Sequence, residues 1–187
     1  MFPYIILGLL MLSNRTIYQL RSRIDKGLNT MYSSSTGSIQ AAIRKLLEKG
    51  YIDYHNIQEN GKKKKEYYIT EAGKHEFNKW INSPVDSAGI KCPELSKIYF
   101  MGFSMQENRS EIITKYITEL KNRYDSLNMI CDESEIFVHS DDYKHLTKEA
   151  RDIVFYQIAC VRFGRDLMSF AIEWYENFLI EMRKSDE

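Results

Sequence analysis

Residues 37–70, GSIQAAIRKLLEKGYIDYHNIQENGKKKKEYYIT, leave few architectures open, because a helical pattern changes to a strand pattern within them. Apolar residues recur at helical spacing in the first part, which predicts an amphipathic helix from Ser35 or Thr36 to Lys49. Gly50 follows at the position where a left-handed cap ends a helix. The chain therefore leaves the helix at Gly50 and continues in another conformation.

A β-hairpin is the conformation that the next residues predict. Residues 51–57 and 65–70 are rich in Tyr and Ile, which favours strands. The Asn60-Gly61 pair between them is a strong signal for a tight hairpin turn. Four consecutive lysines follow this turn, so we expect them at the hairpin tip: Lys62, Lys63, Lys64 and Lys65.

Helical patterns surround this stretch. Residues 3–12 are apolar on every side, as in a buried central helix. Residues 17–28 and 71–81 have amphipathic helical spacing, and the SNRT sequence before residue 17 supplies capping residues. Three helices followed by a two-stranded hairpin form a winged helix-turn-helix. We therefore predict a winged-helix domain over residues 1–82.

The rest of the chain is predicted to be helical. Residues 83–93 carry two prolines, two serines and a glycine, which is typical of a linker. We expect an all-helical dimerisation domain over residues 94–187, so the fold class is mainly α (α+β). Its expected elements are a short helix at 94–103, a helix at about 106–132, an acidic loop at 133–142 and a last long helix from near Tyr143 toward Met182.

Apolar residues on the two long helices are spaced by alternating threes and fours, which is the pattern of helices that pair along a seam. A three-helix appendage cannot bury so long a helix, so we expect a second copy of the chain to cover this stripe. A drug pocket is the less favoured interpretation of the aromatic residues. The expected interface residues are Ile113, Ile117, Leu120, Tyr124 and Leu127, followed by Phe163, Leu167, Phe170, Trp174 and Phe178.

The third helix is the one expected to enter the major groove of DNA. Its outward face carries side chains that suit base edges or phosphates, since Arg pairs with guanine, Gln with adenine and hydroxyls with either base or phosphate. Free N–H groups at its first turn add affinity for an anion. The expected DNA contacts are Tyr18, Ser35, Thr36, Ser38, Gln40, Arg44 and Lys45, together with the four lysines of the hairpin.

Charge is distributed unevenly along the chain, although its net charge is zero. Residues 1–80 hold thirteen Lys and Arg against seven Asp and Glu, a net charge of +6, whereas residues 81–187 hold thirteen against nineteen, a net charge of −6. Adjacent lysines repel one another unless a polyanion lies beside them. This indicates that the first half faces DNA, while a merely solvated turn is the alternative for the lysine run.

Other functional classes receive little support from the sequence. Three widely spaced cysteines suggest neither a disulfide framework nor a zinc cluster, and the four histidines match no zinc pattern, so no metal or cofactor is expected. No phosphate-binding loop or nucleophile elbow is present, so an enzyme is not expected. The longest apolar run, residues 3–12, is too short to span a membrane and lacks the flanks of a signal peptide. We expect a cytoplasmic protein with no membrane partner.

Three sequence segments resemble the PadR family of bacterial and archaeal transcriptional regulators. They are ILGLLMLSNRTIYQL, GSIQAAIRKLLEKGYI and GKKKKEYYITEAG, followed by Trp80. The resemblance is close over residues 4–82. The helical part, with FGRDLMSFAIEWYENFL near its end, is similar to the larger PadR subfamily. Gln40 and Ile17 stand where family members often have a tyrosine and a glycine.

The resemblance implies a homodimer that binds double-stranded DNA at a pseudo-palindromic operator, usually as a repressor. It also implies release of the DNA by a small aromatic or phenolic effector, bound near the dimer interface or between the domains. Whether Gln40 reads a base or a phosphate stays open. The alternative function is a winged-helix module that binds another protein and no DNA, because a fold does not dictate a function.

Overall fold

The computed structural model describes residues 2–27, 35–59, 62–84 and 92–185. The chain divides into two compact units, residues 1–88 and 89–187. Most of the predicted linker at 83–93 lies outside the described residues. The predicted fold class is confirmed, because the units combine many helices with one small antiparallel sheet.

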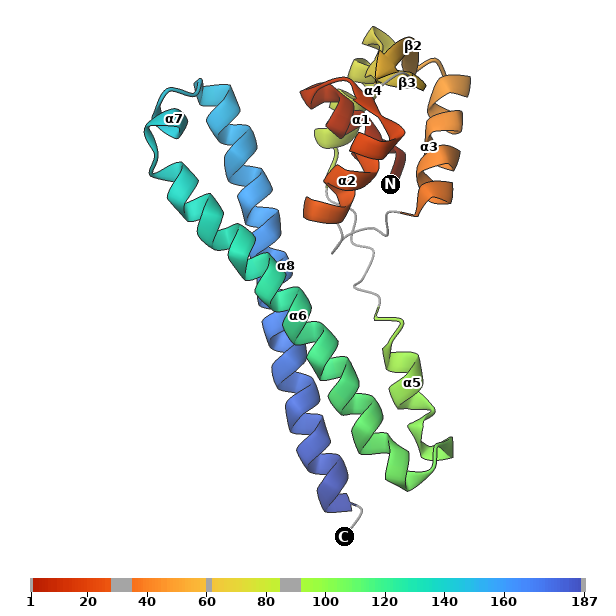
Figure 1. Ribbon diagram of the computed structural model, residues 1–187, viewed down its shortest axis with the longest axis vertical. Helices are drawn as coiled ribbons and strands as arrows, with labels where there is room; N and C mark the ends of the chain where they lie inside the picture. The colour runs from red at the N-terminus through yellow and green to blue at the C-terminus, as the bar shows by residue number, and fades with distance from the viewer. Residues whose placement is uncertain (1, 28–34, 60–61, 85–91, 186–187) are drawn as a thin grey trace. The chain divides into compact units, whose positions relative to one another are not determined.

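The N-terminal unit is a winged helix with a third, short strand that the sequence did not predict. Its sheet has the order β1-β3-β2, and all its neighbouring strands are antiparallel. In Figure 1 the hairpin lies at one end of the unit, with α1, α2 and α3 gathered beside it. The elements are α1 (Phe2–Leu12), β1 (Arg15–Thr16), α2 (Ile17–Gly27), α3 (Thr36–Glu48), β2 (Ile52–Glu59), β3 (Lys62–Ile69) and α4 (Glu71–Ile81).

One apolar core joins these elements. Helix α1 packs against α3 and α4, and its Ile6 and Leu7 are fully buried. Tyr4 of α1 stacks on Trp80 of α4 with 4.9 Å between ring centroids. The Tyr4 hydroxyl donates a 2.7 Å hydrogen bond to Oε1 of Glu76, and this bond raises the pKa of Tyr4. These contacts hold α4 on the helical core.

The hairpin is longer than predicted, and the lysines belong to a strand instead of a tip. Strand β3 begins at Lys62, and β2 continues to Glu59, so the pairing extends to the residues that flank the turn. Lys63 lies opposite Gln58 and Lys65 opposite Asn56. The predicted Asn60-Gly61 turn lies outside the described residues. Because side chains alternate along a strand, consecutive lysines point to opposite faces.

Two glycines fix how α3 and α4 join the sheet. Gly50 has a φ of 68°, and its N–H and that of Tyr51 donate hydrogen bonds to the carbonyls of Leu47 and Leu46. This is a Schellman cap, and it confirms the predicted end of α3. Gly73, in the first turn of α4, lies so close to the Tyr51 carbonyl that a Cβ built there would be 2.0 Å from its oxygen.

The C-terminal unit is a pair of long helices with short helices at its ends. Its elements are α5 (Leu95–Tyr99), the 3₁₀ helix η1 (Met101–Phe103), α6 (Gln106–Val138), α7 (Asp141–Lys144) and α8 (Lys148–Ser185). The predicted acidic loop at 133–142 is wrong in its first part, since α6 continues to Val138. The last helix begins at Lys148 instead of near Tyr143, because α7 forms a separate turn capped by Ser140.

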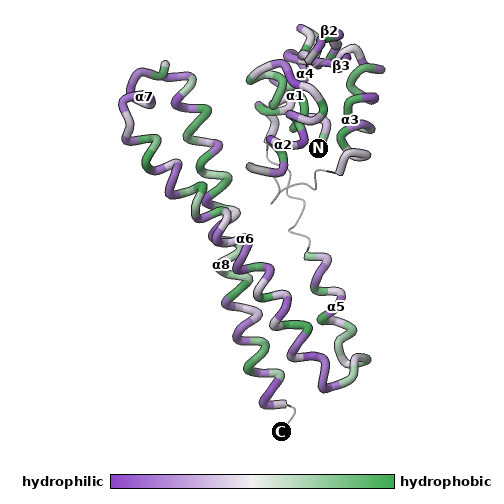
Figure 2. The backbone as a smooth tube through the Cα atoms, in the orientation of Figure 1, coloured by the Kyte–Doolittle hydropathy of each residue, from purple (hydrophilic) through white to green (hydrophobic). Residues whose placement is uncertain are grey.

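Helices α6 and α8 are antiparallel and cover one another. Figure 1 shows them crossing, and Figure 2 shows hydrophobic residues recurring along both. Two ion pairs mark the register, Lys121–Glu176 at 2.7 Å and Arg162–Glu135 at 3.3 Å. Tyr175 lies edge-on against Tyr116, and burial, followed by the neighbouring Tyr116 phenol and the Glu94 carboxylate, raises the pKa of Tyr175 to about 12. Helices α6 and α8 therefore share an apolar core that is separate from the core of the winged helix.

Candidate nucleic-acid interface

Helix α3 separates its apolar and polar residues onto two faces. Ile39, Ile43 and Leu46 are buried against the rest of the winged helix. The predicted reading residues Gln40, Arg44 and Lys45 are all exposed on the opposite face. The structure thus leaves an amide, a guanidinium and an ammonium group along one flank of a single helix.

The first turn of α3 gathers three hydroxyls. The Ser35 hydroxyl accepts a hydrogen bond from the Ser38 backbone N–H at 3.2 Å and lies 2.7 Å from the Ser38 hydroxyl, so it is the N-cap. Thr36 accepts a 3.3 Å hydrogen bond from the guanidinium of Arg21 on α2. Arg21 was not among the predicted contacts, and it brings a cation from the preceding helix to the end of α3.

Helix α2 supplies one more predicted residue. Tyr18 lies in its first turn and is 76% exposed, so its phenol is open to a ligand. The turn is fixed by a capping box in which the Gln19 N–H donates to the Thr16 hydroxyl and the Thr16 N–H donates to Oε1 of Gln19. The SNRT segment thus provides the cap that the sequence predicted.

The lysines of β3 differ from one another in their surroundings. Lys63 and Lys65 are exposed, whereas Lys64 is half-buried. The Lys65 ammonium lies over the ring of Tyr54, 3.9 Å from its centroid. The side chain of Lys62 lies outside the described part of the structure. The lysines of the wing (the hairpin β2–β3) therefore differ in exposure and in their contacts with neighbouring side chains.

The predicted dimer residues fall into two groups. Ile113, Ile117, Leu120 and Leu127 are buried within one chain, where α8 covers them, and Tyr124 is half-buried. These α6 residues are buried because α8 folds back on α6. A second copy of the chain is therefore not required to cover them. Phe163, Phe170 and Trp174 are exposed, while Leu167 and Phe178 are half-buried, and Phe178 packs on the α6–α8 core.

Helix α8 has a second apolar stripe that does not face α6. It continues the predicted residues toward the start of the helix with the same spacing of threes and fours, which could have revealed it in the sequence. Each of its side chains is exposed or half-buried. We call this set the outer stripe of α8: Ile153, Tyr156, Cys160, Phe163, Leu167, Phe170 and Trp174.

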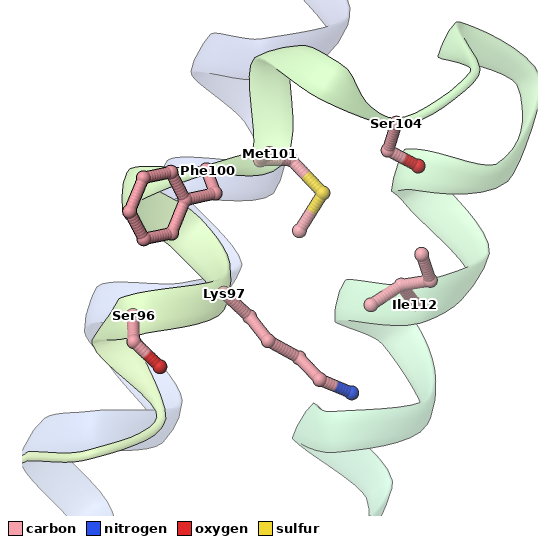
Figure 3. Close-up of a pocket in the computed structure, with 6 residues that line it drawn as sticks. All are labelled: Ser96, Lys97, Phe100, Met101, Ser104 and Ile112. Carbon is pink, nitrogen blue, oxygen red and sulfur yellow. The ribbon is translucent and has the colours of Figure 1, made fainter.

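An open pocket of about 370 Å³ lies beside α5 in the C-terminal unit. In Figure 3 the Lys97 side chain extends from α5 toward α6, and Met101 and Ile112 point into the space between the helices. Phe100, Ser96 and Ser104 complete the lining. Apolar walls with one cation suit a small apolar molecule that carries a negative charge.

Metal and membrane sites receive no structural support from the described residues. Among them, no three His, Cys, Asp or Glu side chains lie close enough together to hold a metal ion. No helix in the same ranges has the length and apolar character needed to cross a membrane.

Comparison with known proteins assigns the winged helix. Residues 6–79 match the sequence profile of the transcriptional regulator PadR-like family. These residues of the chain belong to the PadR-like family. The matched residues run from α1 into α4, so they contain α3 and the hairpin.

Individual relatives extend the likeness to the C-terminal unit. The negative transcriptional regulator PadR of Bacillus subtilis is 28% identical over 112 residues, which cover 58% of this chain and 61% of that relative. Its crystal structure with operator DNA is similar with a TM-score of 0.69, at 22% identity, over 97% of this chain and 98% of that one. Its structure with p-coumaric acid gives 0.65, at 19% identity, over 96% and 97%. The PadR-like regulator BC1756 of Bacillus cereus gives 0.72, at 20% identity, over 98% of both chains.

Proposed function

We propose that this PadR-like protein is a repressor that binds a pseudo-palindromic DNA operator as a homodimer. The observation that carries the DNA-binding part is the polar flank of α3, with Gln40, Arg44 and Lys45 exposed in the same unit as the lysine-bearing strand β3. These side chains suit base edges and phosphates. The name of the Bacillus subtilis relative, a negative regulator, supports repression.

The outer stripe of α8 supports the homodimer. Its exposed aromatic residues form an apolar surface that a second copy of α8 would cover, and twofold symmetry is the usual arrangement for identical chains. A twofold dimer places two reading helices about 34 Å apart, which matches one turn of B-DNA. The operator would then consist of two inverted half-sites.

A small aromatic acid is the effector that we propose for release of the DNA. Bacillus subtilis PadR has been crystallised with p-coumaric acid, a molecule of that class. In this chain the lining of the pocket beside α5 includes Lys97 together with the apolar Phe100, Met101 and Ile112. Such a lining would pair a carboxylate with the lysine and cover an aromatic ring with apolar side chains.

The test is binding of the full chain to duplex DNA from upstream of its own gene. We expect retardation of the fragment at about 50 mM salt and a footprint with two symmetric half-sites one helical turn apart. Addition of p-coumaric acid should release the DNA from the wild type and not from Lys97→Ala. If no duplex is retarded at low salt, DNA binding is wrong and the alternative of a protein-interaction module is favoured.

A further inference from the structure

The hairpin β2–β3 has two faces with different chemistry. Residues directly opposite each other in the register share a face, so Tyr54 and Tyr67 lie on one side together with the Asn56–Lys65 and Gln58–Lys63 pairs. We call this side the inner face, because Tyr67 belongs to the core of the winged helix. The intervening residues, which include Lys64, lie on the outer face.

The two faces carry opposite net charges. The inner face holds Lys63 and Lys65, and Arg15 of β1 lies opposite Tyr67 on the same side. No Asp or Glu occurs among the inner-face residues that the register pairs. The outer face carries Lys64, which the register pairs with Ile57, and also Asp53 and Glu66, so its described side chains include one lysine and two carboxylates.

The inner face is also organised to hold its cation in place. Burial raises the pKa of Tyr67, whose ring lies 5.9 Å from that of Tyr54. Tyr54 in turn supports the Lys65 ammonium at 3.9 Å. A cation fixed on an aromatic ring loses less side-chain entropy when it pairs with an anion.

Exposed amides complete the inner face. Asn56 and Gln58 lie directly opposite the two lysines and are exposed. Their NH₂ groups can donate to phosphate oxygens beside the ammonium groups. The outer face offers Ile57 opposite Lys64 instead, and this apolar side chain cannot bind a phosphate.

We propose that only the inner face of the wing binds the phosphate backbone, through Lys63, Lys65, Asn56 and Gln58, with Tyr54 as a positioning residue. This inference rests on the proposed DNA binding and assigns its backbone contacts. The four adjacent lysines then contribute unequally to DNA binding, because side chains alternate along the strand and every second lysine points away from the duplex. Lys64 lies on the outer face, which also carries Asp53 and Glu66.

The test compares three single variants, Lys63→Ala, Lys65→Ala and Lys64→Ala, each of which removes one lysine from the same strand. Binding of the full-length protein to a labelled 30-base-pair duplex (a length of about three turns) is measured as a function of salt. We expect the slope of log K against log salt to fall by about 0.9 per protomer for Lys63→Ala and for Lys65→Ala. The slope should not change for Lys64→Ala, which is the matched control.

Equal salt slopes for all three variants, or a larger fall of the slope for Lys64→Ala, would contradict the proposal that only the inner face of the wing binds the phosphate backbone. Thermal unfolding of each variant checks that the hairpin is intact, and Tyr54→Phe, which keeps the ring, should bind as the wild type does. Tyr54→Leu should weaken binding as Lys65→Ala does. A wild type that binds no duplex would instead refute the proposed function, so the two failures are distinguishable.

Discussion

Gly73 is a residue whose identity is set by a neighbour twenty-two positions away in the chain. A Cβ at this position would lie 2.0 Å from the Tyr51 oxygen and 2.8 Å from Cγ1 of Ile69. The Tyr51 carbonyl also accepts a 3.1 Å hydrogen bond from the Thr70 N–H, which ties it to the start of α4. The chain therefore cannot relieve a clash here without disturbing the junction of sheet and helix.

We expect Gly73→Ala to lower the free energy of unfolding by about 1–3 kcal/mol, the usual cost of overpacking. Urea unfolding followed by circular dichroism measures it. Gly37→Ala is the matched control, because nothing lies within 4 Å of a Cβ at Gly37 and alanine favours a helix by about 0.5–1 kcal/mol. Equal stabilities for the two variants would contradict the packing argument.

Single residues were predictable from the sequence where their role is local. Gly50 and the Thr16 cap follow from rules that involve only neighbouring residues, and the structure confirms both. Gly73 gave no such signal, because a contact with Tyr51 decides it. Arg21 was missed for the same reason, since its hydrogen bond to Thr36 joins two helices.

At the scale of an element, α3 makes the sharpest prediction about specificity. Arg44→Ala should cost about 1–3 kcal/mol in operator binding and relax the preference at one base position, because a guanidinium pairs with both acceptors of a guanine. Selection of bound sequences from a randomised operator measures this. Lys49→Ala is the control, since Lys49 ends α3 and its ammonium lies 5.7 Å from the centroid of Tyr51. Uniform weakening for all sequences would make Arg44 a phosphate contact.

Element boundaries were the less predictable part of the fold. The Asn60-Gly61 turn signal predicted Lys62–Lys65 at a hairpin tip, yet these lysines pair with β2, although lysine is depleted in strands. The acidic residues over 133–142 indicated a loop, although α6 continues to Val138. Glu135 lies within α6 and forms an ion pair with Arg162 of α8 at 3.3 Å. Strand β1 has two residues and no periodicity to detect.

At the scale of the molecule, α8 has two apolar stripes and only one of them is covered within the chain. The stripe that faces α6 includes Tyr175 and Met182, which are buried. The outer stripe includes Phe163 and Phe170, which are 61% and 64% exposed. The sequence indicated that the long helices carry apolar stripes which another helix must cover. It could not say which stripe the chain covers itself, because both have the same spacing.

The variant Phe163→Asp tests whether the outer stripe joins two copies. We expect a monomer in sedimentation equilibrium, because a carboxylate would be buried in an apolar interface without a partner. Ile180→Asp is the matched control, since Ile180 is 51% exposed on the same helix but lies off the stripe, and this variant should remain a dimer.

DNA binding by the same two variants shows whether the two copies act together. A dimer neutralises the phosphates of both half-sites, so its salt slope should be about twice that of the Phe163→Asp monomer. The monomer should also lose the operator affinity that depends on paired half-sites and keep the contacts of one winged helix. Two results would contradict this proposal: a Phe163→Asp variant that stays dimeric, or a monomeric variant whose salt slope equals that of the wild type. In either case the outer stripe would not be the surface through which two winged helices bind one operator together.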